Sequence, residues 1–260
     1  MKKNITVVLL VVLIAGFALS EKIRIGATPV PHAEILEFIK LELEKEGFEL
    51  EVVVFNDYVL PNMALANGEL DANYFQHVPY LEVFTTERGI EGLVPQPPIH
   101  VEPMGFYAKK GLNKLEKNDK VVVPNDPTNE GRALLLLHNN GIIKLKDPEN
   151  LEATVIDIAE NPKSLKFSEV EAGFIPRVYN TDDSVDAAVI NTNYAISAGL
   201  NPIEDAKFYE GEDSAYANIV VVREEDTNSE WLDVLQSALR SEAVKEFILN
   251  KYEGAVVPTF

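Results

Sequence analysis

The 260-residue chain contains no cysteine. This absence excludes disulfide frameworks, thiolate zinc sites, cysteine-ligated iron–sulfur clusters and cysteine nucleophiles. Stability must therefore come from packing. With 46% apolar residues, the chain can bury a sizeable core rather than stay disordered.

Basic residues are also scarce. The chain has 23 Lys and Arg against 42 Asp and Glu, which gives a formal net charge of −19. Such a field repels phosphate backbones and anionic lipid, so we expect no nucleic-acid partner. The same acidity also serves simply to keep an abundant protein soluble, so charge alone identifies no partner.

The common catalytic motifs are missing together. The sequence has no GxSxG elbow, no HExxH, no P-loop lysine and no GxGxxG after its first strand. His32, His100 and His138 stand apart from any motif and are interpreted as surface or structural residues. Pairs of carboxylates carry little information in so acidic a chain. We therefore expect a binding protein without cofactor or metal rather than an enzyme.

The N-terminus has the pattern of a secretory leader. Lys2 and Lys3 precede an apolar run of roughly 15 residues, with small residues at Ala18 and Ser20. A membrane span needs about 20 apolar residues. Residues 1–20 are therefore expected to be a cleaved export signal or a retained N-terminal anchor.

The hydrophobic pattern predicts alternating strands and helices in two lobes. A strand at 22–27, a helix at 31–47 and a strand at 50–55 form a βαβ unit with a parallel sheet. A second unit has a strand at 120–124 and a helix that includes 133–137. Ligands of such folds bind beyond the carboxyl ends of the strands, and often between lobes.

The remaining pattern completes this outline. Further strands are expected at 153–156, 168–171, 187–190 and 217–222. Two helices close the chain, the first with a capping box of Thr227 and Glu230. Extended segments at 94–98 and 202–209 are interpreted as crossings between the lobes.

Two segments, 55–62 and 71–80, combine aromatic rings with Asn, Asp, Gln and His, as in the wall of a small-molecule pocket. The rings suit an apolar or sulfur-bearing side chain, because sulfur makes favourable contacts with ring edges. Two or three of five candidate rings are expected to touch the ligand: Tyr58, Tyr74, Phe75, His77 and Tyr80.

The turn at 124–132 suits an anion. It joins a strand end to a helix start, where free N–H groups and the helix dipole favour negative charge. Thr128 or Asn129 is expected to cap the helix, and Gly131 permits close approach of a ligand. Arg132, expected in the first turn, is disfavoured there without an anion. A bound carboxylate or a structural ion pair would each supply that anion.

Asparagines also stand at strand ends. Asn191 and Asn193 follow a buried strand, and Asn218 begins another. Asparagine in such positions often forms turns. Its amide equally offers a donor and an acceptor, which suits a zwitterionic amino acid.

With these residues the chain resembles the substrate-binding proteins of the methionine-importer (MetQ/NlpA) lipoprotein family. The matching segments are spread over most of residues 22–260, in the family's order. They are Phe55–Asn62, Asp71–Asn73, Phe75–His77, Pro79–Leu81, Val123–Asn129, Gly131–Arg132, Glu160–Lys163, Ala188–Thr192, and Tyr216 with Asn218. Ile142–Lys146 is a looser match.

The resemblance implies an α/β, two-lobed periplasmic-binding-protein fold of type II. Each lobe is expected to be a mainly parallel sheet flanked by helices, with the ligand in the cleft between the lobes. Lobe 1 would comprise residues 21–105 and 212–260, and lobe 2 residues 106–211. The protein, expected to be a monomer, would deliver L-methionine, or its D-enantiomer, to an ABC permease with a cytoplasmic ATPase.

The resemblance also assigns roles to residues of this chain. By motif position Arg132 would hold the α-carboxylate, Asn191 and Asn218 would fix the polar end, and Glu171 is a candidate helper for the ammonium. The side-chain pocket would be lined by Tyr58, Phe75, His77 and Tyr80.

One departure concerns the anchor. Members usually carry a lipid-modified cysteine after the leader, whereas this chain has Ser20–Glu21 there and no cysteine. We therefore expect an exported protein, periplasmic or at the cell surface, either released by cleavage near Ser20 or held by an uncleaved leader. Other amino acids or short peptides are alternative ligands. Rivals from other classes are a periplasmic hydrolase or lyase using His77 with Asp71, and an adhesion protein.

Overall fold

The computed structural model describes residues 20–211 and 215–260. The leader predicted at residues 1–20 therefore lies outside the described residues, apart from Ser20. Within the described ranges, no helix combines the length and the apolar character needed to cross a membrane.

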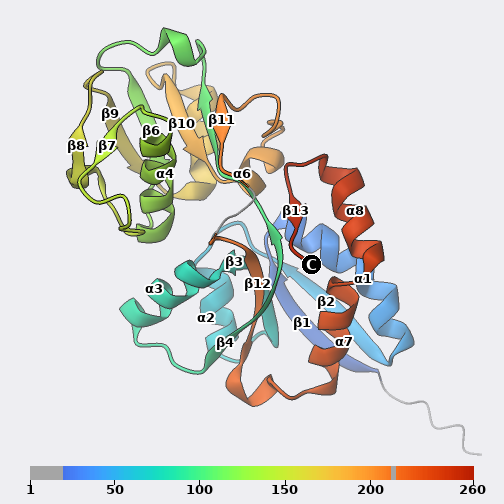
Figure 1. The fold of residues 1–260 in the computed structure, drawn as a ribbon. Coiled ribbons are helices and arrows are strands. Elements are labelled where there is room, and N and C mark those ends of the chain that lie inside the picture. The colour runs from blue at the N-terminus through green and yellow to red at the C-terminus, as the bar shows by residue number, and fades with distance from the viewer. Residues whose placement is uncertain (1–19, 212–214) are drawn as a thin grey trace, which may run out of the picture.

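Strands and helices alternate along the chain, and the strands build two main sheets, as Figure 1 shows. The strands are β1 (Glu21–Ala27), β2 (Phe48–Val54), β3 (Ala72–His77), β4 (Leu93–Val101), β5 (Gly105–Ala108), β6 (Lys120–Pro124), β7 (Lys144–Leu145), β8 (Ile158–Glu160), β9 (Lys166–Val170), β10 (Ala187–Ile190), β11 (Phe208–Tyr209), β12 (Asn218–Arg223) and β13 (Val257–Pro258). The helices are α1 (Glu34–Lys45), α2 (Leu60–Ala66), α3 (Val78–Arg88), α4 (Pro127–Asn139), α5 (Ile175–Thr181), α6 (Thr192–Ser197), α7 (Glu230–Leu239) and α8 (Glu242–Tyr252). Short helical turns are η1 (Pro29–Ala33), η2 (Leu112–Lys114), η3 (Val155–Asp157), η4 (Ala172–Phe174) and η5 (Glu224–Asp226).

The first lobe is built on a six-stranded sheet in the order β13-β4-β12-β3-β1-β2. β1 pairs in parallel with β2 and β3, so that Ile25 lies opposite Val52 and Ala72, while β12 runs antiparallel to β3 and β4. Helices α1, α7 and α8 lie together against this sheet (Figure 1). Their apolar stripes, which include Ile35 and Leu235, bury one cluster with it.

The second lobe has a five-stranded sheet in the order β11-β5-β10-β6-β9, with β10, β6 and β9 parallel. Successive residues of β6 serve opposite faces, as the period of a strand requires. Val121 and Val123 pack in one cluster with Leu134 of α4, whereas Val122 packs in another with Ile175 of α5. The expected two-lobed type II fold is confirmed.

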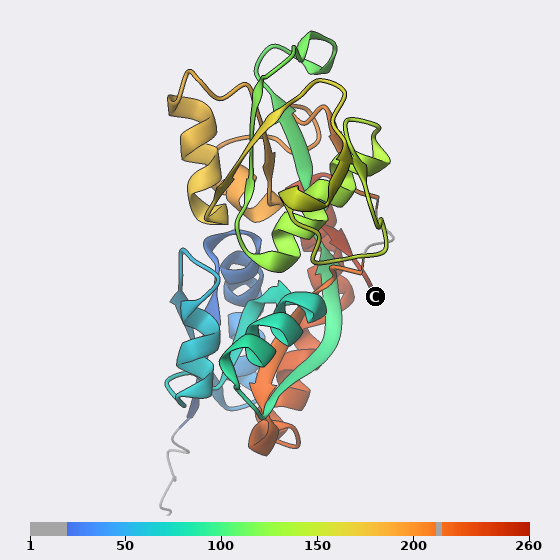
Figure 2. The same ribbon diagram turned by 90° about the vertical axis from the view of Figure 1, so that its left-hand side faces the viewer.

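The chain passes between the sheets at 102–104 and again between β11 and β12, and Figure 2 shows the two lobes one above the other. The crossings predicted at 94–98 and 202–209 are therefore wrong, because β4 and β11 are sheet strands. The prolines of β4 are tolerated because β13 pairs only with His100 and Val101, which leaves the rest of that edge without a partner strand. The lobe boundaries at residues 105 and 212 stay a prediction.

Two local predictions are also wrong. No strand covers 153–156, because Thr154 begins the turn η3 and its backbone N–H donates to the Asp157 carboxylate at 3.0 Å. The capping box does not form either. Ser229 takes the N-cap position of α7, since Thr227 belongs to the preceding turn and donates its hydroxyl to the Glu224 carbonyl.

Candidate functional site

The carboxyl ends of strands from both sheets meet at one cavity, which is where the rule for open α/β sheets places a ligand. The segments after β1, β2, β3 and β4 reach it from the first lobe, and those after β6 and β10 reach it from the second. The cavity encloses about 350 Å³, part of which is open to solvent. It is lined by His32, Tyr58, Phe75, Gln76, His77, Tyr80, Glu102, Asn129, Arg132, Asn191, Thr192, Asn193 and Asn218.

Four of the five predicted rings line this cavity. The ring centroid of Tyr58 lies 5.9 Å from those of Phe75 and Tyr80, and that of His77 lies 6.2 Å from Tyr80. Tyr74 is the exception, because it is fully buried in the core of the first lobe. The four lining rings therefore form one aromatic wall.

Asn191 and Asn193, which follow β10 of the second lobe, add unsatisfied amide atoms to the cavity lining. The Asn191 Nδ2 group donates to Asn129 Oδ1 at 2.8 Å, which orients the amide. The hydroxyl of Tyr58 donates to Asn193 Oδ1 at 2.7 Å. Within the described residues, Asn191 Oδ1 and Asn193 Nδ2 are then buried without a hydrogen bond. Because buried polar atoms are normally paired, this acceptor and this donor indicate contacts that a ligand completes.

The helix that carries Arg132 begins earlier than expected. α4 starts at Pro127, and the carboxylate of Asp126, rather than Thr128 or Asn129, caps it by accepting from the Asn129 N–H at 3.0 Å. Proline at the first helical position is typical of such a start. Arg132 therefore lies in the second turn, and its expected position in the first turn is wrong.

The Arg132 guanidinium lines the cavity and is only 4% exposed. It pairs with the Glu210 carboxylate, with Nε donating at 2.9 Å and Nη2 at 2.6 Å, and Nη2 also donates to the Glu102 carbonyl at 2.7 Å. It stacks at 4.4 Å over the ring of Tyr216. The structural ion pair is thus present, while Nη1 makes no hydrogen bond to any described residue and remains a donor for a ligand.

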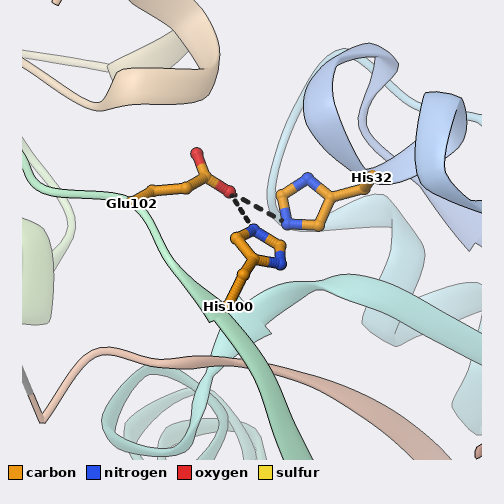
Figure 3. A group of neighbouring side chains, drawn as sticks. All are labelled: His32, His100 and Glu102. Carbon is orange, nitrogen blue, oxygen red and sulfur yellow. Dashed lines mark hydrogen bonds and ion pairs between the residues drawn. The ribbon is translucent and has the colours of Figure 1, made fainter. Parts of the chain in front are cut away.

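Glu102, His32 and His100 form a buried cluster beside this cavity (Figure 3). One carboxylate oxygen, Oε1, lies 2.9 Å from His100 Nε2 and 3.2 Å from His32 Nε2. Burial lowers the pKa of His32 to about 4 and that of His100 to about 3, so both imidazoles are neutral at pH 7. His32 Nε2 also lies 3.0 Å from Asn218 Oδ1, which connects the cluster to a predicted site residue.

Sequence reasoning missed several lining residues. His32 and Glu102 follow the carboxyl ends of β1 and β4, and Thr192 follows that of β10, so the strand-end rule predicts them once the strands are known. Glu102 was hidden because the prolines of β4 disguised the strand. Glu171, by contrast, is exposed before η4 and does not line the cavity.

The structure separates His77 and Asp71, the two residues of the alternative hypothesis of a hydrolase or lyase. His77 ends β3 at the cavity, whereas Asp71 precedes the first residue of the same strand. Six residues of extended chain place them roughly 20 Å apart. The Asp71 carboxylate instead accepts from the Arg24 backbone N–H at 2.7 Å. His77 and Asp71 therefore do not form a catalytic pair.

The fold and the cavity define a class: a two-lobed substrate-binding protein whose ligand site lies between its lobes. The chain matches the NlpA lipoprotein family over residues 23–260 and belongs to that family. Members are binding proteins rather than enzymes.

Individual relatives cover nearly the whole chain. The D-methionine-binding lipoprotein MetQ of Salmonella typhi is 43% identical over 94% of this chain and 92% of its own length. The protein of that name from Escherichia coli K12 is 42% identical over 90% of this chain and 87% of its own length. A nutrient-binding protein from Burkholderia cenocepacia, solved bound to methionine, superposes with a TM-score of 0.86 at 46% identity, covering 92% of this chain and all of that one.

Proposed function

We propose that this chain is the extracytoplasmic substrate-binding protein of an ABC importer, and that it captures free methionine and delivers it to the permease. The observation that carries the proposal is the make-up of one cavity lining. Four rings form its aromatic wall, and a cation together with unsatisfied amide atoms forms its polar wall. The methionine-bound relative from Burkholderia cenocepacia supports the ligand.

The polar wall suits the zwitterionic end of an amino acid. Arg132 Nη1 and Asn193 Nδ2 are donors for the α-carboxylate. Asn218 accepts from His32 through Oδ1, so its Nδ2 is a further donor. Asn191 Oδ1 is an acceptor for the α-ammonium.

The aromatic wall suits a thioether. Tyr58, Phe75, His77 and Tyr80 line the same cavity, and each contact of sulfur with a ring edge contributes about 0.3–1.5 kcal/mol.

We also propose that the protein acts as a monomer outside the cytoplasm and serves a permease coupled to a cytoplasmic ATPase. Export is supported by the lipoprotein names of its relatives. The proposal includes release by cleavage near Ser20 or retention by an uncleaved leader.

Native mass spectrometry of the purified protein, before and after unfolding to strip bound ligand, tests the proposal. We expect one added mass equal to that of methionine, and reloading by either L- or D-methionine identifies the preferred enantiomer. A mass matching another amino acid or a dipeptide would keep the transport function and overturn the ligand. A protein that retains nothing and ignores a panel of amino acids would overturn both.

A further inference from the structure

Glu102 is the anionic residue of the cavity lining, and it is 6% exposed. Its side chain extends from the segment after β4 toward both imidazoles, as Figure 3 shows. Burial raises the pKa of this carboxyl, and the nearby charges and N–H groups oppose the rise. A buried carboxylate normally needs a cationic partner. The Glu102 carboxylate is therefore expected to have a cationic partner.

Among the described residues, the donors that contact the Glu102 carboxylate are neutral. Thr28 Oγ1 lies 2.7 Å from His32 Nδ1, and Tyr74 Oη lies 2.5 Å from His100 Nδ1. When each hydroxyl donates to Nδ1, each neutral imidazole carries its proton on Nε2. His100 then donates to Glu102 Oε1 at 2.9 Å, and His32 donates to Asn218 Oδ1 at 3.0 Å with Glu102 Oε1 3.2 Å away. This arrangement satisfies every nitrogen of the two rings.

Acceptor positions of the carboxylate remain. A carboxylate offers about four lone-pair sites. One receives the N–H of His100, and the Nε2 of His32 lies 3.2 Å from the same oxygen. The backbone N–H of Asn193 further favours the charged form. The carboxylate of Glu102 is thus hydrogen-bonded but not neutralised by any described residue in direct contact with it.

Arg132 does not supply the missing charge directly. Its Nε and Nη2 contact the carboxylate of Glu210, which lies outside the cavity lining. Toward Glu102, Nη2 contacts only the backbone carbonyl, at 2.7 Å. This contact nevertheless places the guanidinium beside Glu102. An amino acid has its carboxylate and ammonium on one carbon, so it can face both groups at once.

The same three side chains have spacing that suits a metal ion, because their ligand atoms all lie within 4.8 Å of one another. A metal would have to replace both Nε2 protons. Both Nε2 atoms have hydrogen-bond acceptors without that replacement, and Glu102 lines a cavity that suits an organic ligand. An ammonium group therefore fits the observations better than a metal ion.

We propose that Glu102 is the counter-ion of the ligand's α-ammonium and makes a free primary amino group a requirement for binding. This inference rests on the proposed function, because it assumes that the cavity holds an amino acid. His32 and His100 act as positioning residues that hold the carboxylate toward the cavity. Deaminated or N-blocked analogues would leave Glu102 as an unpaired buried anion and are rejected.

Isothermal titration calorimetry with two ligands tests this role. The ligands are methionine and 4-(methylsulfanyl)butanoate, which lacks only the amino group. The wild-type protein should bind methionine on the order of 100-fold more tightly. Glu102→Gln should lose most of that preference by binding methionine more weakly. Glu171→Gln, which removes an exposed carboxylate outside the cavity, is the matched control and should keep it.

The outcomes separate this inference from the proposed function. A Glu102→Gln variant that melts like the wild type and keeps its preference for methionine would overturn the role of Glu102 alone. A wild-type ratio near one would do the same, even if the variant failed to fold. A stoichiometric divalent metal in the native mass spectrum would assign the cluster to that metal instead. A wild-type protein that binds no amino acid would overturn the proposed function, and this inference with it.

Discussion

Asn218, at the start of β12, has its amide oriented from one side by the His32 imidazole at 3.0 Å. Replacing Asn218 by alanine should leave the fold intact and weaken methionine binding by roughly 5- to 150-fold. The reason is that a buried group of the ligand would lose its hydrogen-bond partner at a cost of about 1–3 kcal/mol. Calorimetry measures the affinity, and Asn228→Ala, outside the cavity, is the control. An unchanged affinity would remove Asn218 from the site.

The histidine pair predicts how stability depends on pH. His32 has a folded pKa of about 4 against an ordinary value of 6.5, so the unfolded chain binds more protons between these values. Stability is therefore complete above about pH 6.5 and falls as the pH drops toward 4, by about 3 kcal/mol for this residue. Glu102, which favours the proton on His32, and His100, which disfavours it, are the titratable groups that face it.

Urea unfolding of wild type and His32→Gln at pH 7 and pH 4.5 measures this dependence. The variant should lose less stability on acidification, whereas His138→Gln, which removes a histidine outside the cluster, should behave like the wild type. Equal losses in wild type and His32→Gln would contradict the assignment.

At the scale of single residues, the sequence predicted some residues of the cavity lining and missed others. Arg132 and Asn218 were found because they stand beside clear strand patterns, and both line the cavity. Glu102 and His32 were not, because Glu102 follows a proline-rich strand and His32 lies within an irregular turn. The ion pair of Arg132 with Glu210 joins residues 78 positions apart, a contact that no local pattern reveals.

At the scale of elements, α4 depends on one glycine. A Cβ atom at Gly131 would lie 2.1 Å from the backbone oxygen of Leu151, so the helix or the facing loop would have to move. Gly131→Ala should therefore destabilise the protein by about 1–3 kcal/mol, although alanine normally favours a helix by about 1 kcal/mol. It should also weaken ligand binding, because Arg132 moves with the helix.

Urea unfolding and calorimetry check this prediction. Gly211→Ala is the matched control, since a Cβ there meets no atom within 4 Å, and its effect should stay within about 0.5 kcal/mol. A Gly131→Ala protein more stable than the wild type would show that the facing loop yields without cost.

The elements themselves were predictable where periodicity was strong. The expected strand at 120–124 coincides with β6, and α1 buries Ile35, Leu36 and Ile39 as predicted. Phe38 is instead 45% exposed, because it stacks on Phe247 at the surface with ring centroids 4.3 Å apart. Such a contact between distant helices overrides the local pattern.

At the scale of the whole molecule, hydrogen bonds join the lobes across the cleft. The Tyr194 hydroxyl, from α6 of the second lobe, donates to the Asn56 carbonyl after β2 of the first, at 3.2 Å. Tyr194 does not line the cavity. Tyr194→Phe should therefore weaken methionine binding only by favouring the open form, by roughly 2- to 10-fold.

The control for this variant is Tyr179→Phe, in α5 outside the cleft, which should bind as the wild type does. Small-angle scattering of the unliganded proteins should show a larger average radius for Tyr194→Phe. A variant with wild-type affinity would mean that this bond adds nothing to closure.

The central claim is that the cleft binds one free methionine between its aromatic and polar walls. The most direct test is isothermal titration of ligand-stripped protein with L-methionine. The account predicts a saturable one-to-one isotherm for the wild type and a strongly weakened one for Arg132→Ala, which removes a donor for the carboxylate. No heat of binding from methionine, or equal affinity in both proteins, would contradict the account.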